Sequence, residues 1–166
     1  MTLALVLGCA GLLLCVAVLA IAIGRSAAAT PVVYGLCLIA SLLCCVAGAA
    51  HLMGGSAPLS CVLPLGVPWL SAHFRLDALS AYFLAVVGLG SFAASLFALG
   101  HGEHEEAPRR VLPFYPAFLA AMILVLIADD AFTFLVSWEF MSLTSWALVM
   151  AHHRNPDNVR AATSIW

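Results

Sequence analysis

The chain has 166 residues, of which 64% are hydrophobic and only 8% are charged, and its formal net charge is −2. Soluble domains carry about 25% charged residues, so this composition excludes an ordinary water-soluble domain. All six basic residues are arginines, which leaves no basic patch for binding nucleic acid. The composition therefore predicts an all-α integral membrane protein whose solvent is the lipid bilayer.

Two apolar runs in the first third of the chain are long enough to span a bilayer. Residues 2–24 contain no charge and exceed the ~20 residues that a membrane helix needs. A second run covers residues 32–53. A cleaved signal peptide is the alternative for the first run, because Ala27-Ala28-Ala29 resembles a cleavage site, but no Lys or Arg precedes that run. We predict two transmembrane helices.

Residues 54–76 hold apolar side chains interrupted by prolines and glycines. Pro58, Pro64 and Pro68 are too closely spaced for a spanning helix. We predict an interfacial loop or a short hairpin here, with Trp69 at headgroup depth.

Three further apolar runs predict helices at about 77–99, 111–128 and 131–151, and a sixth helix begins near residue 161. Asp77 occupies an N-cap position, and Asp129-Asp130 predicts a tight turn that caps the next helix. The charged stretch 101–110 predicts a water-exposed loop, and a metal site built from its His and Glu residues is the alternative. These helices predict a single transmembrane region over residues 1–166, with about five spans.

Arginine placement predicts the orientation. With five spans, the face that holds the N-terminus, the 54–76 segment and the Asp129-Asp130 turn carries only Arg75. The opposite face should be cytoplasmic because cytoplasmic loops are enriched in basic residues, so the N-terminus should face away from the cytoplasm. The opposite face carries the other five arginines, Arg25, Arg109, Arg110, Arg154 and Arg160.

Glu139 is the charged residue deepest within a predicted span. It lies about nine residues into the 131–151 helix, roughly 13 Å deep and near the bilayer middle, where an ionised side chain costs about 2.5–3.5 kcal/mol. We expect it to face other protein or an internal water path and to relay protons, with Ser142 at i+3 and Ser145 as weaker candidates. The alternative is a protonated carboxyl that only holds helices together. The other four spans contain no basic residue at matching depth, so Glu139 either stays neutral or finds its partner elsewhere.

The cysteines do not predict a metal or redox centre. None of the six forms a C-x-x-C pair, and five lie inside apolar runs; iron–sulfur and zinc sites need thiolates that converge. The chain also lacks motifs for flavin, nickel or nicotinamide. We therefore expect no cofactor in this chain.

Two stretches resemble a known family. Residues 74–83, FRLDALSAYF, and more sharply residues 129–146, DDAFTFLVSWEFMSLTSW, resemble the antiporter-like membrane subunits of respiratory complex I and group 4 hydrogenases, most of all component B of hydrogenase 4 and the matching formate hydrogenlyase subunit. The resemblance covers most of residues 74–166, whereas the first two helices fit only in hydropathy.

The resemblance implies that the chain is the N-terminal part of a proton-translocating subunit in a bacterial inner membrane, with a periplasmic N-terminus. It implies that Glu139 is the family's proton-handling glutamate, which pairs with a lysine on a later helix. Its partners would be other membrane and peripheral subunits of a hydrogenase or dehydrogenase complex, and these would hold the redox centres. A structural membrane subunit without a proton path is the alternative, and an independent small transporter is a weaker one.

Overall fold

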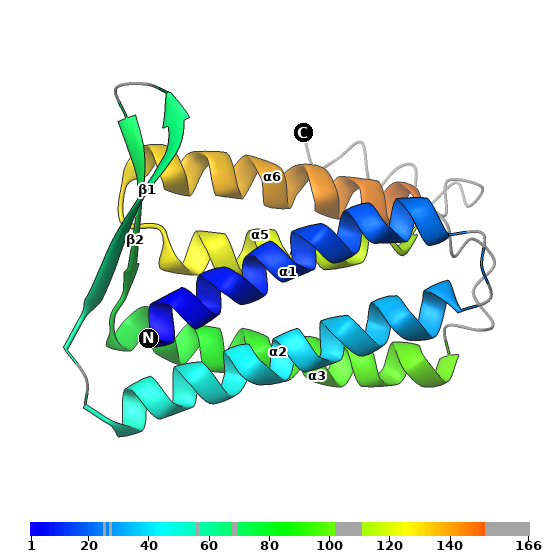
Figure 1. The fold of residues 1–166 in the computed structure, drawn as a ribbon, viewed down its shortest axis with the longest axis horizontal. Coiled ribbons are helices and arrows are strands. Elements are labelled where there is room, and N and C mark those ends of the chain that lie inside the picture. Colours follow the sequence, from blue (N-terminus) through cyan, green and yellow to red (C-terminus); the bar gives the residue numbers. More distant parts are fainter. Residues whose placement is uncertain (25, 27, 56, 68–69, 102–110, 152–166) are drawn as a thin grey trace.

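The computed structural model describes residues 1–24, 26, 28–55, 57–67, 70–101 and 111–151. Within these residues the chain forms long helices that run side by side, with a two-stranded antiparallel hairpin between the second and third helices (Figure 1). The elements are α1 (Thr2–Ile23), α2 (Ala29–Met53), β1 (Leu59–Val67), β2 (Leu70–Leu76), α3 (Ala78–His101), α5 (Phe114–Ile127) and α6 (Ala131–Met150).

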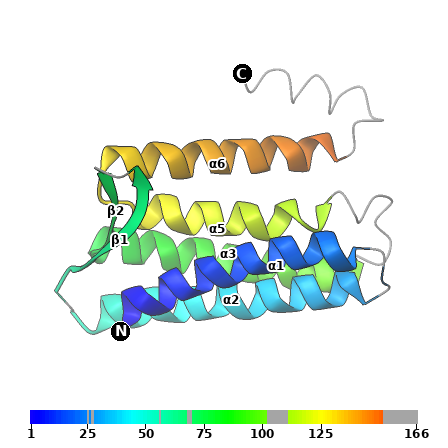
Figure 2. The same ribbon diagram turned by 45° about the horizontal axis from the view of Figure 1, so that its top comes forward.

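The helices form a bundle in which α6 lies at the edge. α2 packs most extensively on α3, α1 lies against α2 and α5, and α6 packs on α5 (Figure 2). The N-terminus, the hairpin and the turn between α5 and α6 all lie at one end of the bundle (Figure 1). This end is called the hairpin end below.

The α2–α3 contact is close because both helices present glycine to the other. A Cβ on Gly48 of α2 would lie 2.6 Å from the backbone oxygen of Ala81, and a Cβ on Gly88 of α3 would lie 2.6 Å from the backbone nitrogen of Cys45. Small residues let membrane helices approach until their backbones touch, and the van der Waals contacts that result help to hold helices together in lipid. The two glycines therefore set the distance between α2 and α3.

The core of the bundle is a continuous cluster of small and branched apolar side chains. On α1 and α2 the buried positions recur at alternating spacings of three and four residues, so each helix buries one face. The largest fully buried side chains include Leu13, Val33, Leu84 and Ile127.

Residues 59–76 form the hairpin, one of the two structures predicted for this segment. Gly55, with a φ of +54°, turns the chain out of α2, and β1 then pairs with β2 from Leu59 opposite Leu76 to Val67 opposite Leu70. The register shifts between Leu63 and Gly66, where Pro64 has no N–H to donate. Trp69 lies outside the described residues.

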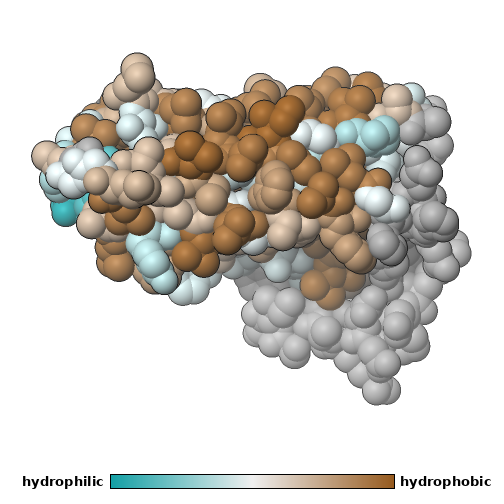
Figure 3. All heavy atoms as spheres, turned by 90° about the horizontal axis from the view of Figure 1, so that it is seen from below, coloured by the Kyte–Doolittle hydropathy of each residue, from teal (hydrophilic) through white to brown (hydrophobic). Residues whose placement is uncertain are grey.

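Four of the described helices, α1, α2, α3 and α6, are long and apolar enough to cross a membrane. α5 has only 14 residues, or about 21 Å at 1.5 Å per residue. It begins at Phe114 and not at residue 111, next to Pro113, which cannot donate a helical hydrogen bond. Apolar side chains cover much of the face drawn in Figure 3. The chain is a multi-pass helical membrane protein.

Several predictions concern segments outside the described residues. The sixth helix near residue 161, the charged stretch 102–110 and five of the six arginines lie there. The orientation across the membrane stays a prediction.

Candidate functional site

The first turn of α6 is capped by Asp130, as predicted, and the same side chain attaches the hairpin. Its carboxylate accepts hydrogen bonds from the backbone N–H and the hydroxyl of Thr133. It also accepts one from the backbone N–H of His73 in β2, at 3.0 Å. These bonds, led by the Thr133 hydroxyl, lower the pKa of Asp130 to about 2. Asp130 therefore stays ionised near neutral pH and holds α6 against β2.

Glu139, the predicted proton-handling residue, lies on the outward side of α6. It is the ninth residue of that helix and is exposed, flanked on its side by the exposed Leu135, Val136 and Leu143. Among the described residues no hydrogen bond or ion pair reaches its carboxyl. The described helices therefore do not enclose Glu139, and any partner for it lies beyond them.

The hydroxyl groups of α6 divide between two sides. Ser142 and Ser145, the weaker predicted candidates, are partly buried, and helical spacing places Ser142 on the same side as Glu139. The hydroxyl residues of α6 that are buried within the bundle are instead Thr133, Ser137 and Thr144. Thr144 donates its hydroxyl to backbone carbonyls of its own helix. The structure thus brings Ser142, but none of the buried hydroxyl residues, to the side of Glu139.

A buried hydroxyl cluster joins α2, α3 and α5, and it was not predicted from the sequence. The hydroxyls of Ser95 and Tyr115 share a hydrogen bond at 2.9 Å, and Tyr115 also reaches the Ser91 carbonyl at 3.4 Å. The Tyr34 ring meets the Tyr115 ring edge-on at 5.3 Å between centroids. Ser91 and Ser95 are four residues apart, and that spacing on one helix face was the available signal.

Charged side chains gather at the hairpin end. Arg75 of β2 lies between two carboxylates, 3.4 Å from Asp77 and 3.6 Å from Asp129. Asp77 caps α3, as predicted, by accepting from the Ser80 N–H, while its own N–H donates to the Ser80 hydroxyl. The Ser80 N–H is the main cause of a lowered pKa at Asp77. Arg75 therefore ties both the start of α3 and the turn between α5 and α6 to the hairpin by charge.

Among the described residues, no group of three or more His, Cys, Asp or Glu side chains is placed to hold a metal ion. The His and Glu residues of 102–110, considered above as a metal site, lie outside those residues.

A bundle of apolar helices, of which four described ones are long enough to cross a membrane, defines a multi-pass membrane protein. No protein-family model matches the chain. The chain is homologous to hydrogenase-4 component B of Escherichia coli, with 39% identity over 79 residues, or 46% of this chain and 12% of that protein. It is also homologous to NADH-quinone oxidoreductase subunit L of E. coli, with 28% identity over 107 residues, or 64% of this chain and 18% of that protein.

A similar match reaches an uncharacterized protein of Mycobacterium tuberculosis, with 34% identity over 100 residues, or 60% of this chain and 15% of that protein. These relatives confirm the predicted resemblance to antiporter-like subunits of hydrogenase-4 and complex I-type complexes. The chain spans less than a fifth of the length of each of these three relatives.

Proposed function

We propose that the chain is part of a proton-translocating subunit in an oxidoreductase complex of a bacterial inner membrane, and that Glu139 is its proton-exchanging group. The observation that carries this proposal is a carboxyl in the middle of a span, on a helix side that the described helices leave uncovered. Intramembrane carboxyls are expensive and as a rule face protein or water. The relatives are components and subunits of hydrogenase and NADH-quinone oxidoreductase complexes, which supports a place in such an assembly.

The chemistry follows from what surrounds a carboxyl. Apolar surroundings favour the protonated form, and a nearby cation favours the ionised form. A basic side chain that approaches and leaves the outward side of α6 would make Glu139 release and take up a proton in turn. We propose that Ser142, on the same side, passes protons to or from it. We assign the redox chemistry that drives such motion to partner subunits, because the relatives are parts of hydrogenase and NADH-quinone oxidoreductase complexes.

A structural subunit is the competing proposal, and it also has an observation in its favour. An outward carboxyl between apolar side chains could form a permanent hydrogen bond to a neighbouring helix and fix two subunits together. In that case Glu139 contributes to assembly and never exchanges its proton.

The Glu139→Gln variant of the full chain in its assembled complex separates the two proposals. Glutamine keeps the shape and hydrogen-bonding ability but cannot titrate, so the complex should assemble and transfer electrons while the proton-to-electron ratio in membrane vesicles falls. Glu139→Asp should lower the ratio less, because it retains a carboxyl.

Glu103→Gln, the same change within the charged stretch 101–110, is the matched control and should leave the ratio unchanged. A normal ratio in a fully assembled Glu139→Gln complex would leave the structural role as the explanation.

A further inference from the structure

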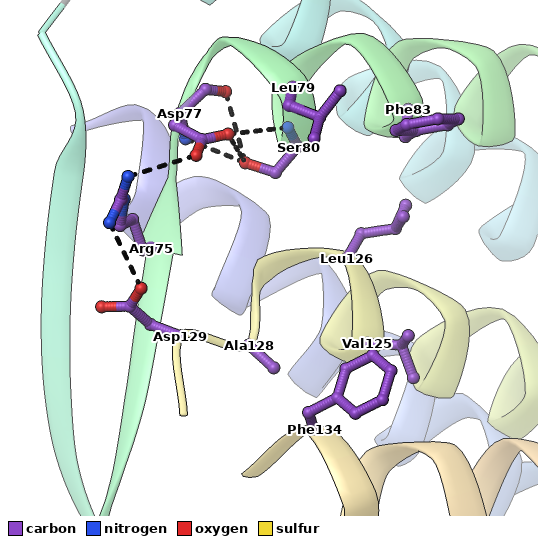
Figure 4. Close-up of a pocket in the computed structure, with 10 residues that line it drawn as sticks. All are labelled: Arg75, Asp77, Leu79, Ser80, Phe83, Val125, Leu126, Ala128, Asp129 and Phe134. Atoms are coloured by element: carbon purple, nitrogen blue, oxygen red, sulfur yellow. Dashed lines mark hydrogen bonds and ion pairs between the residues drawn. The ribbon is translucent and has the colours of Figure 1, made fainter. Parts of the chain in front are cut away.

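A cavity of about 260 Å³ opens at the hairpin end, between the start of α3, the end of α5 and the start of α6. Its two halves differ in chemistry (Figure 4). Arg75, Asp77 and Asp129 form one side, next to the hairpin, and apolar side chains form the other. The apolar side includes Leu79, Phe83, Val125, Leu126 and Phe134.

α3 and α5, which border the cavity, contact each other far less than α2 and α3 do. Its charged side is held in place from several directions. The Asp77–Ser80 hydrogen bonds fix the start of α3, and the Asp129 N–H donates to the His73 carbonyl of β2 at 2.9 Å. The charged groups are therefore preorganised and do not have to be gathered by a ligand.

The charged side chains at the opening neutralise one another only in part. The Arg75 side chain is 46% exposed and the Asp129 side chain 36% exposed, and both ion-pair distances exceed those of a close charged hydrogen bond. One guanidinium between two carboxylates leaves a net charge of −1. A ligand that carries both an anion and a hydrogen-bonding cation matches this arrangement, whereas a purely anionic ligand meets the surplus carboxylate.

We propose that this cavity binds a phospholipid whose headgroup carries a primary ammonium, as in phosphatidylethanolamine. The phosphate lies at Arg75, the ammonium donates to Asp129, and the first part of an acyl chain lies between Leu79 and Leu126. The volume is just under the roughly 300 Å³ at which pockets begin to hold whole small molecules, which fits part of a chain and not a complete ligand. The position also fits, because α3 begins at Ala78 and α5 ends at Ile127, the level at which headgroups meet helix ends.

The test is lipid retention by the full chain, measured by native mass spectrometry after equilibration with defined lipids. Phosphatidylethanolamine should be retained roughly tenfold more than phosphatidylcholine, whose trimethylammonium cannot donate a hydrogen bond to a carboxylate. Phosphatidylglycerol should be retained least. Asp129→Asn should abolish the preference for ethanolamine over choline, and Arg75→Gln should weaken the retention of both.

Filling the cavity with a larger side chain tests the proposal without changing the charged residues. Leu126→Trp places an indole in the apolar half and should release the bound lipid, whereas Leu135→Trp, on the exposed side of α6, should not. Equal retention of the ethanolamine and choline lipids by the unaltered chain would overturn the proposal. Undiminished lipid retention in a folded Leu126→Trp variant would also overturn it. That result would mean that the lipid binds elsewhere, as it would if another helix filled the cavity in the full chain.

Discussion

α2 and α6 are both long enough to span a membrane, but they are packed in different ways. In the most apolar stretch of α2, 44% of the residues are buried and the mean hydropathy is 2.3, whereas in α6 the values are 17% and 1.3. The less apolar helix is thus the less covered one. Lipid would favour the reverse, because polar groups cost least when protein surrounds them. The difference supports the proposal that the uncovered side of α6 contacts further protein, whereas α2 already packs along one face.

The largest effect should come from the glycine that α2 presents to α3. Gly48→Ala places a Cβ 2.6 Å from the Ala81 backbone oxygen, so the two helices must separate, at about 3 kcal/mol. Gly35→Ala on the same helix has open space around its Cβ and should leave stability unchanged or slightly higher. Unfolding in mixed detergent and dodecyl sulfate measures both variants. Equal stability of the two would mean that α2 and α3 are not in backbone contact.

A smaller effect should separate buried from outward valines. Val33→Ala on α2 leaves a void at a fully buried position and should destabilise the chain by about 2 kcal/mol, since lost packing contacts are not replaced. Val136 on α6 is 53% exposed. Val136→Ala should therefore change the free energy of unfolding by less than about 0.5 kcal/mol. The same detergent unfolding applies. A large loss for Val136→Ala in the isolated chain would contradict the edge position of α6.

The smallest effect concerns the attachment of α6 to the hairpin. Asp130→Ala removes the cap and the His73 contact and should cost about 1–2 kcal/mol at pH 7. Because folding lowers the pKa of Asp130 to about 2, its stabilisation is complete above about pH 4, the ordinary carboxyl range, and is lost as the pH falls toward 2. The difference in unfolding free energy between the variant and the unaltered chain should therefore be smaller at pH 3 than at pH 7, and it should vanish only below about pH 2.

Asp129→Ala is the control for that change, because its side chain makes only an exposed ion pair with Arg75. Such pairs contribute about 0–1 kcal/mol. A larger loss for Asp129→Ala than for Asp130→Ala would show that the ion pair, and not the cap, attaches the hairpin.

The features that depend on nearby residues were predictable. Runs of apolar residues indicated the spans, and the caps at Asp77 and Asp130 followed from side-chain chemistry next to a helix start. The contact of Asp130 with His73 was not predictable, because it joins residues 57 positions apart. The outward side of Glu139 was not predictable either, because polar and apolar residues are spread around α6, so periodicity does not indicate which side meets α5. Hydropathy overestimated the length of α5. The apolar run covers residues 111–128, but the helix has 14 residues because it begins only after Pro113.

The link between His73 and Asp130 also bears on the order in which the chain folds. The segment that it closes contains all of α3 and α5, so the contact can form only after both helices have been synthesised. Contacts between distant residues are late events in folding because the loop between them must first be ordered. We therefore expect the attachment of the hairpin to the first turn of α6 to be a late step in the folding of this end of the bundle.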